Sequence, residues 1–293
     1  PRDWSSDVCS SDLAPAGAAA LAVGAARLVV GGLALIVAVP VLGGRRRSAL
    51  ALWRTRWGLL GGLTTAGYQL CFFAATRSAG VAVATLLDIG SGPVIVGVLE
   101  WALWRTRPGR AWWVATAICV TGLALLGADG LSRPDVPAAG VLLAVGAGAS
   151  YACYAIAAKA LLNVGARADE DVTAEFSLGG LLLAPVLLVT DVAWLGQPAG
   201  LAVALWLGLG ATAAAYVLFG RGQRVLEAGP TATLVLAEPL VAALLGIVVL
   251  GERLSPPAVA GAALIAAGLT VQGLSSARAQ RPQRADITGA PPA

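Results

Sequence analysis

The sequence contains no histidine and no methionine, and only 12% of its 293 residues are charged. Without histidine, the chain cannot use Ser-His or Cys-His catalysis, histidine metal sites or histidine proton relays. Soluble domains usually carry about 25% charged residues, so a surface that faces water throughout is excluded. Disordered chains are poor in apolar residues, whereas 58% of this chain is apolar. What remains is a protein whose outer surface faces lipid.

The missing methionine concerns the start of the chain, which reads Pro1-Arg2-Asp3. Residues 1–13 are polar and lack the basic and apolar regions of a signal peptide. We expect this stretch to be non-native or disordered and the chain to be processed or incomplete at this end. Residues 276–293 are expected to form a disordered tail.

Cysteine and positive charge are too scattered to form a site. Cys9, Cys71, Cys119 and Cys153 form no CxxC spacing, so neither a zinc site nor a disulfide framework is indicated. No phosphate-binding loop motif is present. The net charge of +4 comes from residues spread through short loops, which argues against nucleic acid. We expect no metal, no cofactor and no nucleic-acid partner.

Long apolar runs dominate the chain. A membrane-crossing helix needs about 20 mostly apolar residues, and the sequence contains nine such runs. Each is apolar around its whole circumference, as a membrane span would be. No segment alternates with the period of two that a membrane barrel needs. The predicted spans are Ala16–Leu42, Trp57–Thr76, Val81–Trp104, Trp112–Gly127, Val136–Leu162, Phe176–Trp194, Leu201–Gly220, Thr231–Leu250 and Pro257–Leu274.

Positive residues between the spans indicate an orientation. Alternate connections hold only Arg77, Arg133 and Arg253. Because positive residues gather on the cytoplasmic side of membrane proteins, the connections with the richer set are predicted to be cytoplasmic, and the C-terminus with them. This set comprises Arg45, Arg46, Arg47, Arg54, Arg56, Arg105, Arg107, Arg110, Lys159, Arg167, Arg221, Arg224, Arg278, Arg281 and Arg284.

An internal repeat is visible without gaps. An offset of 146 residues aligns Pro93–Gly127 with Pro239–Gly273, and the identities include proline, arginine and two glycines. Upstream, Ala66-Gly67-Tyr68 parallels Ala214-Ala215-Tyr216. The repeat leaves span Val136–Leu162 without a partner, so we expect a first helix to be missing from the chain. Repeats of five spans insert with opposite orientation, which is typical of secondary transporters.

At these residues the sequence resembles the EamA family of the drug/metabolite transporter superfamily. The resemblance rests on Leu236-Ala237-Glu238-Pro239, on Gly251-Glu252-Arg253 and on the glycines of the last span. It implies a ten-helix carrier, five plus five, with residues 14–127 as a first repeat lacking one helix and 136–275 as the second. Arg105-Thr106-Arg107 departs from the family's Gly-Glu-Arg, and Asp88 to Pro93 departs from its Glu-Pro.

Charged groups within the spans are candidate functional residues, because charge at membrane depth is costly. Arg27 lies 18 residues before Arg45, about 27 Å along a helix, and so at or beyond mid-depth. It either holds a substrate carboxylate or phosphate or pairs with a carboxylate of a neighbouring helix. Asp88 and Glu238 either bind an amine or exchange a proton, or are neutralised by Arg27 or cap freed backbone groups.

Other polar groups fall at helical spacing. Tyr68, Tyr151, Tyr154 and Tyr216 either line a passage or bond a neighbouring backbone group. Proline removes a backbone donor and bends a helix, so helix breaks are predicted at Gly92, Pro93 and Pro239. Glu100, one turn before Trp104, is expected to snorkel to the interface.

We therefore expect an all-α integral membrane protein: nine visible helices of a ten-helix inverted-repeat carrier. The expected function is secondary transport of small polar metabolites such as amino acids, in the direction of efflux, across a bacterial cytoplasmic membrane. Its partners would be the solute and the lipid bilayer, and a proton or counter-solute and a homodimer are left open. The alternative is an integral-membrane enzyme or a non-transporting scaffold.

Overall fold

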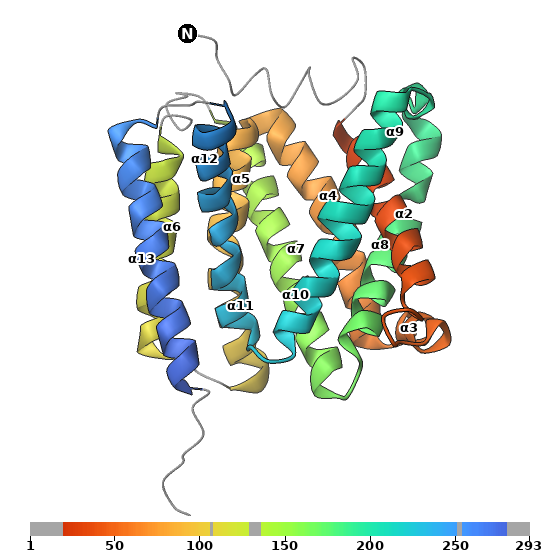
Figure 1. Ribbon diagram of the computed structural model, residues 1–293, viewed down its shortest axis with the longest axis horizontal. Coiled ribbons are helices and arrows are strands. Elements are labelled where there is room, and N and C mark those ends of the chain that lie inside the picture. Colours follow the sequence, from red (N-terminus) through yellow and green to blue (C-terminus); the bar gives the residue numbers. More distant parts are fainter. Residues whose placement is uncertain (1–19, 106–107, 129–135, 251–253, 280–293) are drawn as a thin grey trace, which may run out of the picture.

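The computed structural model describes residues 20–105, 108–128, 136–250 and 254–279, and its regular structure within these ranges is helical (Figure 1). The stretch 1–13 lies outside these residues. The elements are α2 (Ala20–Ala38), α3 (Arg46–Leu52), α4 (Arg56–Ala79), α5 (Val81–Trp104), α6 (Arg110–Leu126), α7 (Ala138–Asn163), α8 (Ala168–Val189), the short helix η2 (Ala193–Gly196), α9 (Pro198–Leu205), the π-helical segment η3 (Trp206–Ala214), α10 (Ala215–Gln223), α11 (Ala228–Val235), α12 (Ala237–Leu250) and α13 (Pro256–Ala279).

Each of the nine predicted ranges overlaps a helical segment in the described part of the chain, but only seven segments are long and apolar enough to cross a membrane. α6 falls short in length, with 17 residues. α4 has 24 residues but is less apolar, because it carries Thr64, Thr65, Tyr68 and Gln69. The seven are α2, α5, α7, α8, the continuous α9–η3–α10, the pair α11–α12, and α13.

One predicted span begins in the wrong place. The range Phe176–Trp194 treats the acidic residues before Phe176 as loop, whereas α8 begins at Ala168 and ends at Val189. Asp169, Glu170 and Asp171 occupy its first turn, where negative charge is favoured by the helix dipole. α8 therefore carries buried carboxylates into the bundle.

α6 and α13 lie side by side, joined through small residues (Figure 1). A Cβ added at Gly122 would lie 2.9 Å from the Ile265 side chain, and one at Gly268 would meet the Cys119 sulfur. Gly268 stands 146 residues after Gly122, and Ile265 stands 146 residues after Cys119. Each helix thus contacts the other through equivalent positions of the sequence repeat. Two elements related by a two-fold axis make contacts of this kind.

α2 and α8 pack in the same reciprocal way. A Cβ at Gly32 would lie 2.8 Å from the Phe176 carbonyl oxygen, and one at Gly180 would lie 2.8 Å from that of Leu28. Here the counterparts are 148 residues apart, the offset that also relates Tyr68 to Tyr216. Both helix pairs approach closely because glycine leaves the backbone uncovered.

One end of the bundle, the arginine-rich end, holds α3 and the α5–α6, α7–α8 and α10–α11 connections, at the bottom of Figure 1. The described residues of the richer predicted set lie in these connections or at the helix ends beside them, except Arg278, which lies in the last turn of α13. Arg107, Arg133, Arg253, Arg281 and Arg284 lie outside the described residues. α13 continues to Ala279, four residues into the predicted tail, and residues 280–293 are not described.

Glu100 was predicted to snorkel, and the structure shows this to be wrong. Glu100 is 6% exposed. Its carboxylate accepts hydrogen bonds from the backbone N–H groups of Ala228 (3.2 Å) and Gly229 (3.0 Å) in the first turn of α11. It therefore satisfies donors that a helix N-terminus leaves open and links α5 to α11.

Candidate functional site

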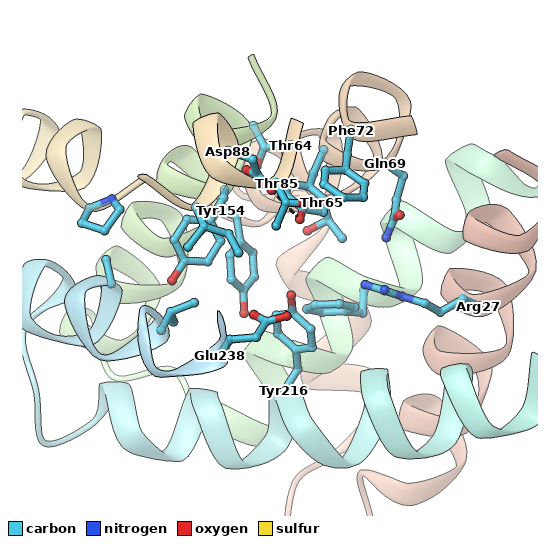
Figure 2. Close-up of a pocket in the computed structure, with 17 residues that line it drawn as sticks. Arg27, Thr64, Thr65, Gln69, Phe72, Thr85, Asp88, Tyr154, Tyr216 and Glu238 are labelled. Carbon is cyan, nitrogen blue, oxygen red and sulfur yellow. Dashed lines mark hydrogen bonds between the residues drawn. The ribbon is translucent and has the colours of Figure 1, made fainter. Parts of the chain in front are cut away.

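A cavity of about 230 Å³ lies inside the bundle, between α2, α4, α5, α7, α8, α10, α11 and α12 (Figure 2). The structure brings all seven predicted pathway residues to its wall. Thr64, Thr65, Gln69 and Thr85 add polar groups, and Phe72 and Phe176 add rings. The seven residues are Arg27, Tyr68, Asp88, Tyr151, Tyr154, Tyr216 and Glu238.

Asp88 lies on α5 and is 3% exposed. Its Oδ2 accepts a hydrogen bond of 2.8 Å from the Tyr68 hydroxyl of α4. Gly148 of α7 packs directly on this segment, since a Cβ there would lie 2.7 Å from the Asp88 carbonyl oxygen. Asp88 is thus held by the protein, and its bond fixes the Tyr68 ring at the wall.

Arg27 lies on α2 and points toward the cavity (Figure 2). Within the described residues it forms no ion pair, and its buried Nε has no hydrogen-bond partner. Arg27 nevertheless lies within electrostatic range of Glu238 of α12, so the predicted pairing with a carboxylate of a neighbouring helix stays a prediction. A guanidinium without a partner is suited to bind a carboxylate through two parallel hydrogen bonds.

Glu238 faces the same cavity from the second residue of α12, near Tyr216 (Figure 2). It remains exposed at the wall. No hydrogen bond or ion pair is formed by its carboxylate with any described residue. Glu238 is therefore the acidic group of the cavity that a cationic group can reach.

Aromatic rings from three helices form one side of the site. Tyr154 of α7 packs edge-on against Phe176 of α8 and Tyr216 of α10, with ring centroids 5.7 Å and 5.9 Å away. Tyr151 approaches Tyr154 at 6.3 Å. The hydroxyls of Tyr151 and Tyr154 are buried and have no partner in the described structure. The expected alternative, a bond to a neighbouring backbone group, is not formed by these two.

The helix is interrupted close to one of the two predicted prolines and continues through the other. Between α11 and α12 the helix is interrupted at Leu236, three residues before Pro239, where proline's missing N–H leaves the Val235 carbonyl without its usual donor. Pro93 lies inside α5, which runs unbroken from Val81 to Trp104. The prediction of a break there is wrong, because neighbouring helices support a proline-containing span.

Gly92 meets α7 rather than opening the helix. A Cβ at this position would lie 3.2 Å from the Tyr151 ring. The glycine lets α5 and α7 approach at the cavity wall.

Residues 251–253 of the Gly-Glu-Arg motif lie outside the described part of the chain.

Sequence reasoning missed the acidic face of α8 beside this cavity. Asp171 and Glu175 are both 0% exposed. Charge interrupts hydrophobicity, so the predicted span begins only at Phe176, but the spacing of four residues places both acids on one helix face. That spacing, next to an apolar run, was the available signal.

Comparison with known proteins agrees with the resemblance to the EamA family. The model of the EamA-like transporter family matches the chain twice, at residues 4–128 and 138–273. These matches cover most of the chain in two parts. The chain belongs to the EamA-like transporter family.

Relatives within this family are named as transporters. The chain is 39% identical over 269 residues to the uncharacterized transporter YwfM of Bacillus subtilis, which covers 92% of this chain and 89% of that protein. It is 29% identical over 219 residues to the threonine/homoserine exporter RhtA of Escherichia coli, covering 70% and 68% respectively. A crystal structure with 21% identity has the same fold, with a TM-score of 0.74 over 89% of this chain and 90% of the other. This EamA-family chain is therefore a multi-pass membrane protein of a transporter family.

Proposed function

We propose that this protein is a secondary transporter that exports small polar metabolites, amino acids or closely related compounds, by alternating access. The observation that carries the proposal is that one cavity holds two opposite charges, Arg27 and Glu238, neither of which forms an ion pair within 4 Å with a described residue. A zwitterion carries a carboxylate for Arg27 and an ammonium for Glu238. Both groups would otherwise be costly at membrane depth.

The size of the cavity fits a small solute. Pockets for drug-sized ligands usually measure about 300–1,000 Å³, and this cavity measures about 230 Å³. The aromatic and threonine side chains supply a wall for the remainder of the solute. The relative named as an exporter of threonine and homoserine supports this class of solute and this direction.

Reciprocal packing supports alternating access. The α6–α13 and α2–α8 contacts repeat at the sequence offsets, and carriers with inverted repeats rock one repeat against the other around a central site. We propose residues 14–127 and 136–275 as the two repeats, and a ten-helix carrier as the complete arrangement. The arginine-rich end would face the cytoplasm of a bacterial cell, with the C-terminus on the same side.

Export from bacterial cells tests this proposal. Cells that produce the full-length protein are loaded with a threonine-containing or a homoserine-containing dipeptide, and extracellular L-threonine or L-homoserine, respectively, is measured over time. We expect export to exceed that of cells without the protein, and Arg27→Ala and Glu238→Gln to lower it at least tenfold. Arg77→Ala, at the exposed last turn of α4, and Glu227→Gln, whose side chain is 68% exposed, are the matched controls.

Two results would contradict the proposal. Wild-type export at the level of cells without the protein would contradict the transport function for these solutes. Export by Arg27→Ala and Glu238→Gln at the level of the two controls would show that the cavity charges do not bind the solute. Membrane abundance of each variant is measured alongside.

A further inference from the structure

Asp171 and Glu175 form a buried acidic pair beside the central cavity. They lie one turn apart on α8, and both are 0% exposed. None of their four carboxylate oxygens has a hydrogen-bond partner within the described residues. Burial of an ionised carboxylate without a partner is among the costliest arrangements in a protein.

Neighbouring acids on the same helix are satisfied, which sets this pair apart. Asp169 accepts from the Arg221 guanidinium at 3.0 Å. Glu170 accepts from the Arg45 backbone N–H at 2.8 Å. The unpartnered state therefore belongs to Asp171 and Glu175 and is not a general property of the first turns of α8.

A second group without a hydrogen-bond partner lies near the pair. The Tyr154 hydroxyl of α7 is buried and unbonded and lies within electrostatic range of both carboxylates. Tyr154 also lines the central cavity, so one side chain is adjacent to both. On the α4 side, Glu175 packs so closely on Gly61 that a Cβ there would overlap the carboxylate.

The cations on the elements around α8 are engaged or placed elsewhere. Arg46 of α3 donates to the Ile36 and Val37 carbonyls, and Lys159 of α7 donates to the Gln223 and Leu226 carbonyls. The others are Arg47 of α3, which is exposed, Arg27 of α2 at the cavity, Arg56 of α4 over the Trp57 ring, Arg77 in the exposed last turn of α4, and Arg221 of α10 with Asp169. Among the titratable hydroxyls, that of Tyr68 donates to Asp88, and those of Tyr151 and Tyr216 lie at the cavity.

A proton is the ligand that matches these groups. Ionised carboxylates only accept hydrogen bonds, and binding of a proton turns one oxygen into a donor and removes the charge. Two carboxyls one turn apart repel each other when both are ionised. No group of three or more potential metal ligands occurs in the described residues, so the pair lacks the ligand number that a divalent cation requires.

We propose that Asp171 and Glu175 form the proton-binding pair that couples proton entry to solute export, with Tyr154 between the pair and the cavity. The proposal rests on the transport function proposed above. An O–H bond forms on one carboxylate when the cavity opens outward, and that bond breaks when the pair releases its proton toward the arginine-rich end. One solute leaves as one proton enters, and no other reactant is needed.

Infrared spectroscopy tests the pair without any solute. The full-length protein in lipid is taken from neutral to alkaline pH, and the carbonyl band of protonated carboxylic acids is followed. We expect wild type to lose more of this band than Asp171→Asn/Glu175→Gln does, because amides keep the shape of the neutral acids but hold no exchangeable acid proton, while the other acids contribute equally to both. Glu227→Gln serves as the control and should behave as wild type. An identical band in wild type and in the double variant would overturn the proposal.

Flux in proteoliposomes tests the coupling. We expect a pH gradient to raise wild-type L-threonine flux at least tenfold, and the double variant to lose this response while it retains exchange of internal for external L-threonine. Wild-type exchange that ignores the pH gradient, or that follows a sodium gradient, would overturn the proposal even if the variant does not fold. Absence of any L-threonine exchange by wild type would count against the proposed function, and the infrared result then still decides whether the pair binds protons.

Discussion

Asp88 and Glu238 are acids on the same cavity with different surroundings. Asp88 is buried and bonded to Tyr68, whereas Glu238 is exposed and free of hydrogen bonds to described residues. A bonded carboxylate positions its neighbour, while a free carboxylate is available to a solute. We therefore propose that Glu238 binds the ammonium of the solute and that Asp88 holds the Tyr68 ring.

Replacing Tyr68 by phenylalanine should reveal the strength of this bond. Side-chain hydrogen bonds between membrane helices are worth about 1 kcal/mol, so Tyr68→Phe should lower the free energy of unfolding by about that amount. The measurement is reversible unfolding in detergent for Tyr68→Phe, Asp88→Asn and the double variant. The double variant should lose less than the sum of the singles. Strict additivity would show that the two side chains do not interact.

Solute analogues that lack one charge should bind poorly. Threoninol lacks the carboxylate that Arg27 would bind, and 3-hydroxybutyrate lacks the ammonium that Glu238 would bind. Each should compete with labelled L-threonine at least tenfold less well than unlabelled L-threonine does, a loss of about 1.4 kcal/mol or more. Competition by either analogue equal to that of L-threonine would contradict the assignment of the corresponding residue.

At the scale of elements, glycine decides how closely the helices approach. Gly268 of α13 faces the α6 backbone, where an added Cβ would lie 2.9 Å from the Ala115 carbonyl oxygen. Gly273 of the same helix has nothing within 4 Å of an added Cβ. The two glycines therefore form a matched pair with opposite expectations.

Gly268→Ala should destabilise the protein by about 1–3 kcal/mol, the usual range for overpacking. Gly273→Ala should be neutral or stabilising by up to about 1 kcal/mol, because alanine has the higher helix propensity. Thermal unfolding of the two variants in the same detergent measures the difference. Equal unfolding temperatures would contradict the close α6–α13 contact.

The helices and the cavity wall could largely be predicted from the sequence, because long apolar runs and isolated charges are local signals. The start of α8 could not be predicted from hydropathy, because Asp169 to Glu175 interrupt the apolar run and their burial depends on partners far away in the chain. Arg221, which pairs with Asp169, is 52 residues away, and the Arg45 N–H that bonds Glu170 is 125 residues away. Hydropathy contains no information on such contacts.

The role of proline was only half predictable for a related reason. Pro93 and Pro239 have equivalent places in the repeat, yet α5 continues through Pro93 while the helix is interrupted before Pro239. Each proline lacks a backbone N–H, so one helical hydrogen bond is lost at each of the two positions. Whether the helix also opens depends on what packs around it, which the sequence alone does not show.

At the scale of the whole molecule, the arginine-rich end predicts an orientation. A fluorescent protein that matures only in the cytoplasm, fused after residue 293, should fluoresce in a bacterial host. A periplasm-dependent alkaline phosphatase at the same place should be inactive. An active phosphatase together with a dark fluorescent fusion would place the C-terminus outside and reverse the proposed orientation.

In the proposed transport cycle, the cavity between Arg27 and Glu238 binds the solute that the protein carries across the membrane. Counterflow tests it most directly: liposomes with purified full-length protein are filled with unlabelled L-threonine and diluted into a trace of labelled L-threonine. We predict transient accumulation of label with wild type and Arg77→Ala, and none with Arg27→Ala. Accumulation of label with Arg27→Ala equal to that with wild type, or no accumulation with wild type, would contradict solute binding in this cavity.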